Sequence, residues 1–224
     1  MEAIKPFEAE RRRMTEIQIR RRGIYDEGVL NAMRNVPRHE FVPTKFLERA
    51  YEDGALPIGD VETISQPYIV AAMTEAARVQ SGDRVLEVGG GSGYQAAVLA
   101  FLGAQVYSVE RNPSLADRAR ARLARLGYGN VEIICADGSE GYIAAAPYRA
   151  ILVTAASPQP PPALIEQLAE DGRLVIPVGP LNGQRLQLIC KRAGKTFIED
   201  ISLCQFVPLI GKYGWPEGTT THLP

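Results

Sequence analysis

From residue 83 to residue 178 the chain repeats one unit, a short apolar strand followed by a turn and a helix. Strands that are joined through helices lie parallel in one sheet, and the helices then cover both of its faces. The repetition therefore predicts an α/β fold with a Rossmann-like, doubly wound and mainly parallel sheet. Strands are expected at residues 85–88, 105–110, 131–135, 150–153 and 174–178, and helices at residues 94–102, 113–126 and about 163–169.

The part of the chain before this repetition has a different pattern. Residues 11–35 have helical periodicity with an interruption at Gly23, and residues 69–79 are helical again. Between these helices, several prolines and glycines predict loops and short elements. We therefore expect residues 1–80 to form a helical and loop extension that contributes to the active site.

The last part of the chain predicts an antiparallel addition to the sheet. Residues 185–190 and 196–207 have strand character and flank a turn at residues 193–195. The pattern does not fix the order of the final strands. With this hairpin, residues 81–224 are expected to form the Rossmann-like domain, integrated with the extension in one globular unit.

Composition and charge exclude several classes of protein. The chain has 224 residues, of which 46% are hydrophobic and 23% are charged, as in an ordinary globular protein. Its formal net charge of -1 gives no general reason to expect nucleic acid or a membrane surface as a partner. The arginine-rich segment 11–22 is interpreted as a solvated helix face. Without a signal-like or membrane-spanning apolar run, the expected compartment is the cytoplasm.

The cysteines and histidines do not form a metal-binding pattern. Cys135, Cys190 and Cys204 are far apart in the sequence, and the chain has only two histidines. This spacing favours neither a disulfide framework nor a zinc site. We therefore expect no metal, and we interpret all three cysteines as small core residues.

A glycine-rich turn follows the first strand of the repetition. Gly89, Gly91 and Gly93 have no Cβ atoms, so a ligand can approach the backbone closely at the start of the next helix. Ligands of doubly wound sheets bind beyond the carboxyl ends of the strands. The turn therefore predicts a ligand site.

The turn alone leaves two classes of ligand open. The pattern G-x-G-x-x-A, which ends at Ala96, also fits a nicotinamide or flavin dinucleotide. However, Glu87 lies two residues before Gly89, where a carboxylate would repel a diphosphate and attract a cationic amino group. Glu87 therefore favours S-adenosylmethionine as the cofactor.

Acidic residues also end the next two strands. Glu110 is placed to accept hydrogen bonds from ribose hydroxyls, which both classes of cofactor carry. Asp137, followed by Gly138, could accept from an adenine amine. An acidic residue near the end of each of three strands is unlike a chance arrangement. It again favours S-adenosylmethionine as the cofactor.

Several motifs, which together span nearly the whole chain, resemble those of the protein-L-isoaspartate O-methyltransferase family. The most specific is Thr63-Ile-Ser-Gln-Pro67. The chain departs from the family pattern at Gly90, where threonine is frequent, and at Ala136, where glycine is usual. The other motifs are residues 36–43, 50–53, 56–59, the glycine turn, 151–156, 173–179 and 206–209.

The resemblance implies a class I methyltransferase fold and methyl transfer from S-adenosylmethionine to the free α-carboxylate of L-isoaspartyl residues in damaged proteins. It implies that Ser65 is the catalytic residue and orients this carboxylate. It also implies that Thr63, Ile64, Ser65, Gln66 and Tyr68 bind the cofactor or close the site around it. Residues 56–59 and the segment from Val207 are expected to form a peptide groove, and a monomer is expected.

Two alternatives to this interpretation remain at the level of sequence. A nicotinamide-dependent oxidoreductase is supported by the G-x-G-x-x-A pattern and Glu110, although no Tyr-x-x-x-Lys pair for proton relay is evident. A non-catalytic adaptor could retain the fold and recognise damaged protein. Turnover that depends on S-adenosylmethionine would separate the methyltransferase from both alternatives.

Overall fold

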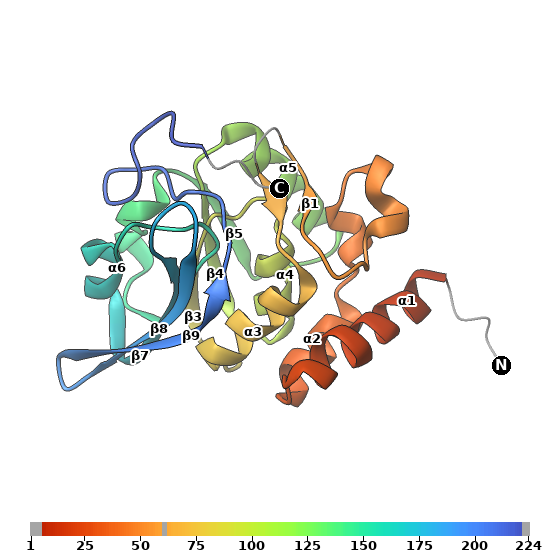
Figure 1. Ribbon diagram of the computed structural model, residues 1–224, viewed down its shortest axis with the longest axis horizontal. Coiled ribbons are helices and arrows are strands. Elements are labelled where there is room, and N and C mark those ends of the chain that lie inside the picture. Colours follow the sequence, from red (N-terminus) through yellow and green to blue (C-terminus); the bar gives the residue numbers. More distant parts are fainter. Residues whose placement is uncertain (1–5, 60–61, 221–224) are drawn as a thin grey trace.

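The computed structural model describes residues 6–59 and 62–220, and its centre is a sheet with the strand order β5-β4-β3-β6-β7-β8-β9. The first five strands in this order are parallel neighbours, as the strand–helix repetition predicts (Figure 1). The strands are β3 (Arg84–Val88), β4 (Gln105–Glu110), β5 (Val131–Cys135), β6 (Tyr148–Val153), β7 (Leu168–Val178), β8 (Gln184–Arg192) and β9 (Lys195–Cys204).

The central strands are buried on both faces of the sheet. On β6, Ala150 and Leu152 pack into a hydrophobic cluster that includes residues of α3, α4 and α5. The alternate residues Ile151 and Val153 pack into a second cluster, which includes Leu164 of α6. This alternation is the period-two geometry of a strand, and it explains why these strands are apolar throughout. The helices are α3 (Pro67–Ala77), α4 (Tyr94–Phe101), α5 (Pro113–Arg125) and α6 (Pro162–Glu166).

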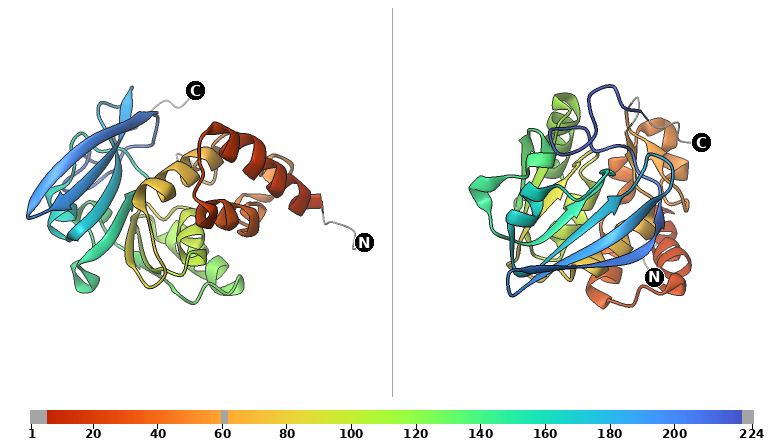
Figure 2. Two further views of the ribbon diagram at one scale, coloured as in Figure 1. Left: turned by 90° about the horizontal axis from the view of Figure 1, so that it is seen from below. Right: turned by 60° about the vertical axis from the view of Figure 1, so that its left-hand side comes forward.

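The C-terminal strands form the predicted hairpin, and the structure gives their order. β8 pairs antiparallel with β7, and β9 pairs antiparallel with β8 at the edge of the sheet. The turn between them has positive φ angles at Ala193 and Gly194. Chain order is therefore kept from β7 to β9, and the hairpin lies at the opposite end of the molecule from α1 (Figure 2).

The helix predicted at residues 163–169 is shorter than expected, and the expected bounds are wrong at its C-terminal end. α6 ends at Glu166, and Leu168 already pairs with Tyr148 of β6. The pairing of β6 with β7 then shifts register before Ala150 meets Arg173. The side chain of Leu168 is buried between these strands, so packing against the sheet overrides its local helical pattern.

The N-terminal extension packs directly on the sheet domain. Met14 and Leu30 of the extension belong to the same hydrophobic cluster as Val98 of α4 and Val106 of β4. The division at residue 80 therefore stays a prediction about organisation within one continuous core. The elements of the extension are α1 (Pro6–Met14), the π-helix η1 (Thr15–Ile19), the short helices η2 (Arg20–Arg22), η3 (Arg38–Phe41) and η4 (Thr44–Arg49), α2 (Glu27–Asn35), β1 (Leu56–Pro57) and β2 (Thr63–Ile64).

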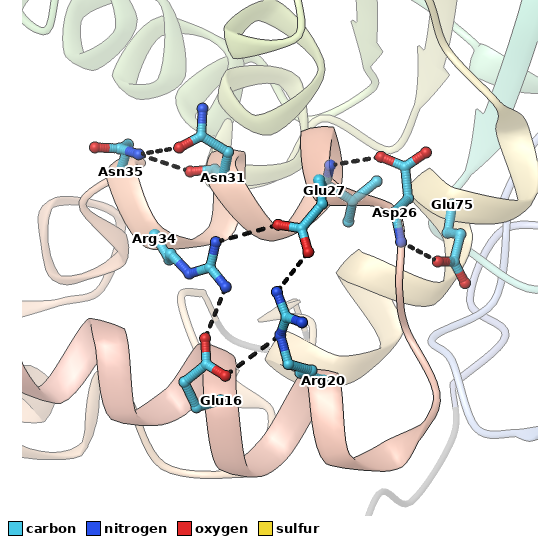
Figure 3. Close-up of polar contacts among 9 residues, drawn as sticks. Glu16, Arg20, Asp26, Glu27, Asn31, Arg34, Asn35 and Glu75 are labelled. Carbon is cyan, nitrogen blue, oxygen red and sulfur yellow. Dashed lines mark hydrogen bonds and ion pairs between the residues drawn. The ribbon is translucent and has the colours of Figure 1, made fainter.

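Charged side chains join the helices of the extension on their outer face (Figure 3). Glu16 accepts from Arg34 at 2.7 Å, and Glu27 accepts from Arg20 at 2.6 Å. The carboxylate of Glu75 on α3 accepts the backbone N–H of Asp26 at 2.8 Å. In the arginine-rich segment, Arg12, Arg13, Arg21 and Arg22 are exposed, as expected of a solvated helix face, whereas Arg11 and Arg20 are half-buried. The contact of Glu75 with Asp26 ties α2 to the helix that follows the Thr63–Pro67 motif.

The interpretation of the cysteines as core residues is wrong for Cys135 and holds only in part for Cys190 and Cys204, which pack against the hydrophobic core. Cys135 is exposed, and Cys190 and Cys204 are half-buried. Cys135 ends β5, an edge strand, and Cys204 ends β9, the opposite edge. Strand ends at the sheet edges have fewer neighbours than central positions, which explains the exposure. Within residues 6–59 and 62–220, every helix is too short or too polar to span a bilayer.

Candidate cofactor and substrate site

A cleft opens beyond the carboxyl ends of the parallel strands β3, β4 and β6. Its walls come from three separate parts of the chain: the segment that includes β2, the glycine turn with its neighbouring strand ends, and the C-terminal segment. The lining residues are Glu62–Ser65, Val70, Glu87–Ser92, Tyr94, Gln95, Val109–Arg111, Gly138, Thr154, Ala155, Val207–Ile210, Thr219 and Thr220. The cleft lies where the sequence predicts a ligand.

Backbone geometry explains two of the predicted glycines. Gly89 has φ +92°, and a Cβ atom there would lie 2.5 Å from the hydroxyl of Thr154. Gly91 has φ +52°, and its N–H donates to the carboxylate of Glu110 at 2.8 Å. Both residues line the cleft. Glycine is therefore required here for backbone conformation and for the close approach of β6.

Gly93 has a different role, since it is not among the described residues that line the cleft. It is the N-cap of α4 with φ +85°, and a Cβ atom there would lie 3.2 Å from Leu123 of α5. The absence of a side chain at this position permits α4 to pack closely on α5. Any direct contact of Gly93 with a cofactor stays a prediction.

Glu87 is fully buried at the end of β3 and lines the cleft. One carboxyl oxygen accepts the hydroxyl of Ser108 at 2.5 Å, and within the described residues the other oxygen has no hydrogen-bond partner. The pKa of Glu87 is raised to about 8, mainly by burial and also by the negative charge of Glu110, while hydrogen bonds from Ser108 and from the backbone of Ala96 act in the opposite direction. The carboxyl group is thus incompletely satisfied by the protein alone.

Glu110 and Asp137 are held in contrasting ways. The carboxylate of Glu110 lines the cleft and accepts one backbone N–H on each oxygen, from Gly91 and from Asn112. Asp137 accepts from the N–H and the hydroxyl of Ser139 and from the N–H of Lys212, and it is not among the lining residues. Gly138 does line the cleft. The structure places Asp137 as an anchor of the C-terminal segment, and its contact with adenine stays a prediction.

The Thr63–Pro67 motif forms the opposite wall. Thr63 and Ile64 form β2, which pairs antiparallel with Leu56 and Pro57 of β1. Thr63, Ile64 and Ser65 all line the cleft, and Ser65 is half-buried. Its position at the cleft wall, directly before α3, agrees with a role in contacting a bound substrate.

Gln66 and Tyr68 are not among the described residues that line the cleft. The amide of Gln66 donates to Asp53 at 2.8 Å, and the guanidinium of Arg22 lies 3.7 Å from the centre of the Tyr68 ring. Arg22 also pairs with Asp53 at 3.0 Å. These contacts join the extension to the start of α3, and they would hold Ser65 in place indirectly. Cofactor contacts of Gln66 and Tyr68 stay predictions.

The structure adds residues that the sequence patterns did not single out. The hydroxyl of Thr154 donates to the carbonyl of Gly89 at 2.6 Å and fixes the glycine turn from β6. The amide of Gln95 is buried in the cleft, donates to Thr74 at 2.9 Å and leaves its oxygen without a partner among the described residues. Gln95 falls on a variable position of the G-x-G-x-x-A pattern. Nothing in the sequence marks Thr219 and Thr220 as cleft residues.

These features fit the predicted sulfonium cofactor better than a dinucleotide. The second carboxyl oxygen of Glu87 and the amide oxygen of Gln95 are buried, belong to residues that line the same cleft, and accept no hydrogen bond of ordinary geometry from the described residues. A ligand with a cationic amino group supplies donors to both, whereas a diphosphate supplies acceptors and negative charge. The glycine turn leaves room for backbone approach. The residues present therefore fit S-adenosylmethionine.

Sequence relatives agree with this assignment. Residues 9–214 match the family model described as protein-L-isoaspartate(D-aspartate) O-methyltransferase. A protein-L-isoaspartate O-methyltransferase of Methanoculleus marisnigri is 57% identical over 210 residues, which are 94% of this chain and 96% of the relative. One of Koribacter versatilis is 53% identical over 209 residues, which are 93% of this chain and 94% of the relative.

Solved structures give the same result. A protein-L-isoaspartate O-methyltransferase superposes with a TM-score of 0.83 and 31% identity, over 91% of this chain and 67% of that one. A Plasmodium falciparum structure of the same description, in complex with S-adenosyl-L-homocysteine, has a TM-score of 0.79 and 27% identity, over 89% of this chain and 98% of that one. The chain therefore belongs to the protein-L-isoaspartate(D-aspartate) O-methyltransferase family.

Proposed function

We propose that this protein transfers a methyl group from S-adenosylmethionine to the free α-carboxylate of L-isoaspartyl residues in damaged proteins and peptides. The observation that carries the proposal is the buried, half-satisfied carboxyl group of Glu87 in a cleft that Ser65 also lines. Family membership supports the substrate class. The cofactor, when bound, supplies an electrophilic methyl group on a sulfonium.

Different residues of the cleft bind different groups of the cofactor. Glu87 and Gln95 accept from the cationic amino group, and Glu110 keeps free lone pairs for the ribose hydroxyls. Gly89 and Gly91 let the ligand lie against the backbone. The turn keeps its shape because Thr154 donates to Gly89 and because Gly89 and Gly90 donate to the carbonyl of Val109.

Ser65 orients the substrate by donating its hydroxyl to the substrate carboxylate. An α-carboxylate has a pKa of about 3.3–3.7, so it is already ionised at neutral pH and needs no general base. This agrees with a cleft whose described lining contains no histidine or cysteine. Catalysis then consists mainly of holding the nucleophilic oxygen against the methyl group in a productive orientation.

The decisive experiment uses labelled S-adenosylmethionine and two peptides that differ only in one isoaspartyl or normal aspartyl linkage. We expect base-labile label on the isoaspartyl peptide alone, because a methyl ester hydrolyses in base. Label on neither peptide, in protein that binds S-adenosyl-L-homocysteine, would contradict the proposed substrate. Label on both would contradict the specificity.

We further propose that the protein acts as a monomer in the cytoplasm. The three free cysteines agree with a reducing compartment. Light scattering of the purified protein tests the first statement, and fractionation of cells tests the second.

A further inference from the structure

A second cavity, of about 520 Å³, opens on the sheet away from the cofactor cleft. Its described lining is Arg78, Arg149, Asp171, Arg173, Cys190 and Arg192. Arg149 is near the start of β6, whereas Thr154, which lines the cleft, follows the end of the same strand. At about 3.3 Å per residue, roughly 17 Å of strand separates the two sites.

Sheet pairing brings the arginines together from separate elements. Arg173 of β7 lies opposite Cys190 of β8, and Arg192 lies two residues further along β8, on the same face as Cys190. Arg78 directly follows α3, and a guanidinium nitrogen of Arg173 donates to the carbonyl of Ala76 in that helix at 3.2 Å.

On the β6 side, Arg149 donates to the backbone carbonyl of Asp171 at 2.5 Å. The positions of Arg149 and Arg173 are thus fixed by contacts with backbone rather than with carboxylates. Asp171 itself has φ +56°, a left-handed conformation that aspartate tolerates better than most residues. The cavity wall is therefore built from defined backbone geometry on three strands and one helix end.

The charges around this cavity are unbalanced. Four guanidinium groups surround it with one carboxylate, while the whole chain has a formal net charge of -1. Within the described residues, none of these four arginines forms an ion pair. Burial lowers the pKa of Arg173, and the positive charges of Arg78, Arg192 and Arg149 lower it further, whereas Cys190 acts in the opposite direction. The guanidinium groups are therefore close enough to repel one another.

We propose that this cavity binds a small polyanion with more than one phosphoryl group. Planar guanidinium groups match phosphate oxygens in pairs, and several of them converging on one cavity can neutralise several charges. The volume lies within the roughly 300–1,000 Å³ that is usual for small-molecule sites. The described lining contains no aromatic side chain on which a base of single-stranded nucleic acid could stack, which favours a compact anion. Inorganic polyphosphates and nucleoside polyphosphates share this chemistry.

The test is calorimetric titration of the full-length protein with sodium tripolyphosphate at low ionic strength. An excess of S-adenosyl-L-homocysteine is present to occupy the cofactor cleft, and a repeat without it shows whether the two sites are separate. We expect saturable binding in both conditions, weakened by added salt. Binding that disappears when S-adenosyl-L-homocysteine is added would place the anion in the cleft and overturn the proposal.

Two substitutions, one that removes a positive charge and one that removes a negative charge, make the test specific for this cavity. Arg192→Gln, at an exposed residue, is expected to weaken binding about tenfold, the value of one charge-assisted hydrogen bond. Asp171→Asn removes the one carboxylate of the described lining and is expected to strengthen binding severalfold, since asparagine also accepts a positive φ. The matched control is Arg13→Gln, at an exposed arginine on α1. Circular dichroism confirms that each variant is folded.

A titration with ATP in place of tripolyphosphate distinguishes an inorganic polyphosphate from a nucleoside polyphosphate as the ligand. Equal affinities would assign recognition to the phosphoryl chain, and tighter binding of ATP that Arg192→Gln still weakens would add a contribution from the nucleoside. No saturable binding of either compound overturns the proposal, as does binding that changes equally in Arg13→Gln. None of these outcomes depends on methyl transfer, so failure here leaves the proposed function intact.

Discussion

Glu87 of β3 and Ser108 of β4 lie directly side by side in the parallel sheet, and the hydroxyl of Ser108 donates to one carboxyl oxygen of Glu87 at 2.5 Å. Within the described residues the second carboxyl oxygen accepts no hydrogen bond of ordinary geometry, although the backbone N–H of Ala96 lies close enough to the carboxyl group to lower its pKa. A buried acid that is satisfied on one side only is costly for folding and is found where a ligand completes it. The pair therefore connects stability, pH and cofactor binding.

The stability of the ligand-free protein should fall as pH rises from about 5 to 8. The pKa of Glu87 is raised from 4.5 to about 8, so the folded state holds a proton that the unfolded state has lost in this range. The free energy of unfolding decreases with rising pH wherever the folded state binds more protons than the unfolded state. Here the decrease amounts to up to a few kcal/mol. Urea denaturation at several pH values measures this. Glu87→Gln should flatten the slope, and an unchanged slope in that variant would contradict the assignment.

Binding of S-adenosyl-L-homocysteine should release a proton near pH 7. A cationic amino group beside Glu87 favours the ionised carboxylate and so lowers its raised pKa. Titrations in buffers of different ionisation enthalpy report the number of protons released. Wild-type protein should release a fraction of one proton, and Glu87→Gln should release less. Equal release in both proteins would mean that another group titrates.

Ser65→Ala should lower turnover about 10- to 100-fold while the affinity for S-adenosyl-L-homocysteine changes little. Loss of one positioning hydroxyl misplaces the substrate carboxylate, and small errors in approach cost rates of this size. The measurements are steady-state kinetics with the isoaspartyl peptide and calorimetry with the product. Wild-type turnover with normal affinity would show that Ser65 does not orient the substrate.

Gly93→Ala should destabilise the protein more than Gly127→Ala. Both glycines have φ above +80°, so each substitution carries a backbone cost of about 1–2 kcal/mol. A Cβ atom at Gly127 meets nothing within 4 Å, whereas one at Gly93 lies 3.2 Å from Leu123 and forces α4 away from α5. Thermal denaturation of the two variants compares these costs. Equal destabilisation would mean that the helix contact is unimportant.

Gly90→Ala and Ser108→Ala should be energetically coupled. A Cβ atom at Gly90 would lie 2.5 Å from the Ser108 hydroxyl, which must move and so lose its hydrogen bond to Glu87. Gly90→Ala should therefore destabilise wild-type protein by about 1 kcal/mol and the Ser108→Ala variant by much less. A double-mutant cycle in urea measures the difference. Additive effects would show that the hydroxyl adapts without loss.

Much of this fold follows from periodicity and from turn residues. The strands at 105–110 and 131–135 have the predicted bounds, because each follows a glycine-containing turn and places apolar side chains in the core, although β5 at the sheet edge is only partly buried. α5 begins at Pro113, where Asn112 caps it through two backbone N–H groups. Such local signals, Asn-Pro at a start and glycine at an end, act within a few residues and can be read directly.

The remaining parts of the fold and of the site depend on contacts between residues that are far apart in the sequence, which local patterns do not predict. Leu168 is drawn into β7 by Tyr148, twenty residues earlier in the chain, so the helical pattern around it is misleading. In the site, the glycine turn and Glu87 were predictable, since they lie within one motif. Gln95 in α4, Thr154 just after β6 and Thr219 in the C-terminal segment reach the same cleft, and only the folded topology brings them together.

The cleft is walled at once by residues just after position 61 and by residues just before position 221. A molecule bound there contacts both the segment that leads into α3 and the C-terminal segment, which lie far apart in the sequence. Its binding energy opposes local opening of either segment, by an amount that grows with the logarithm of its concentration. The concentration of the cofactor thus influences how firmly these two segments are held at the cleft.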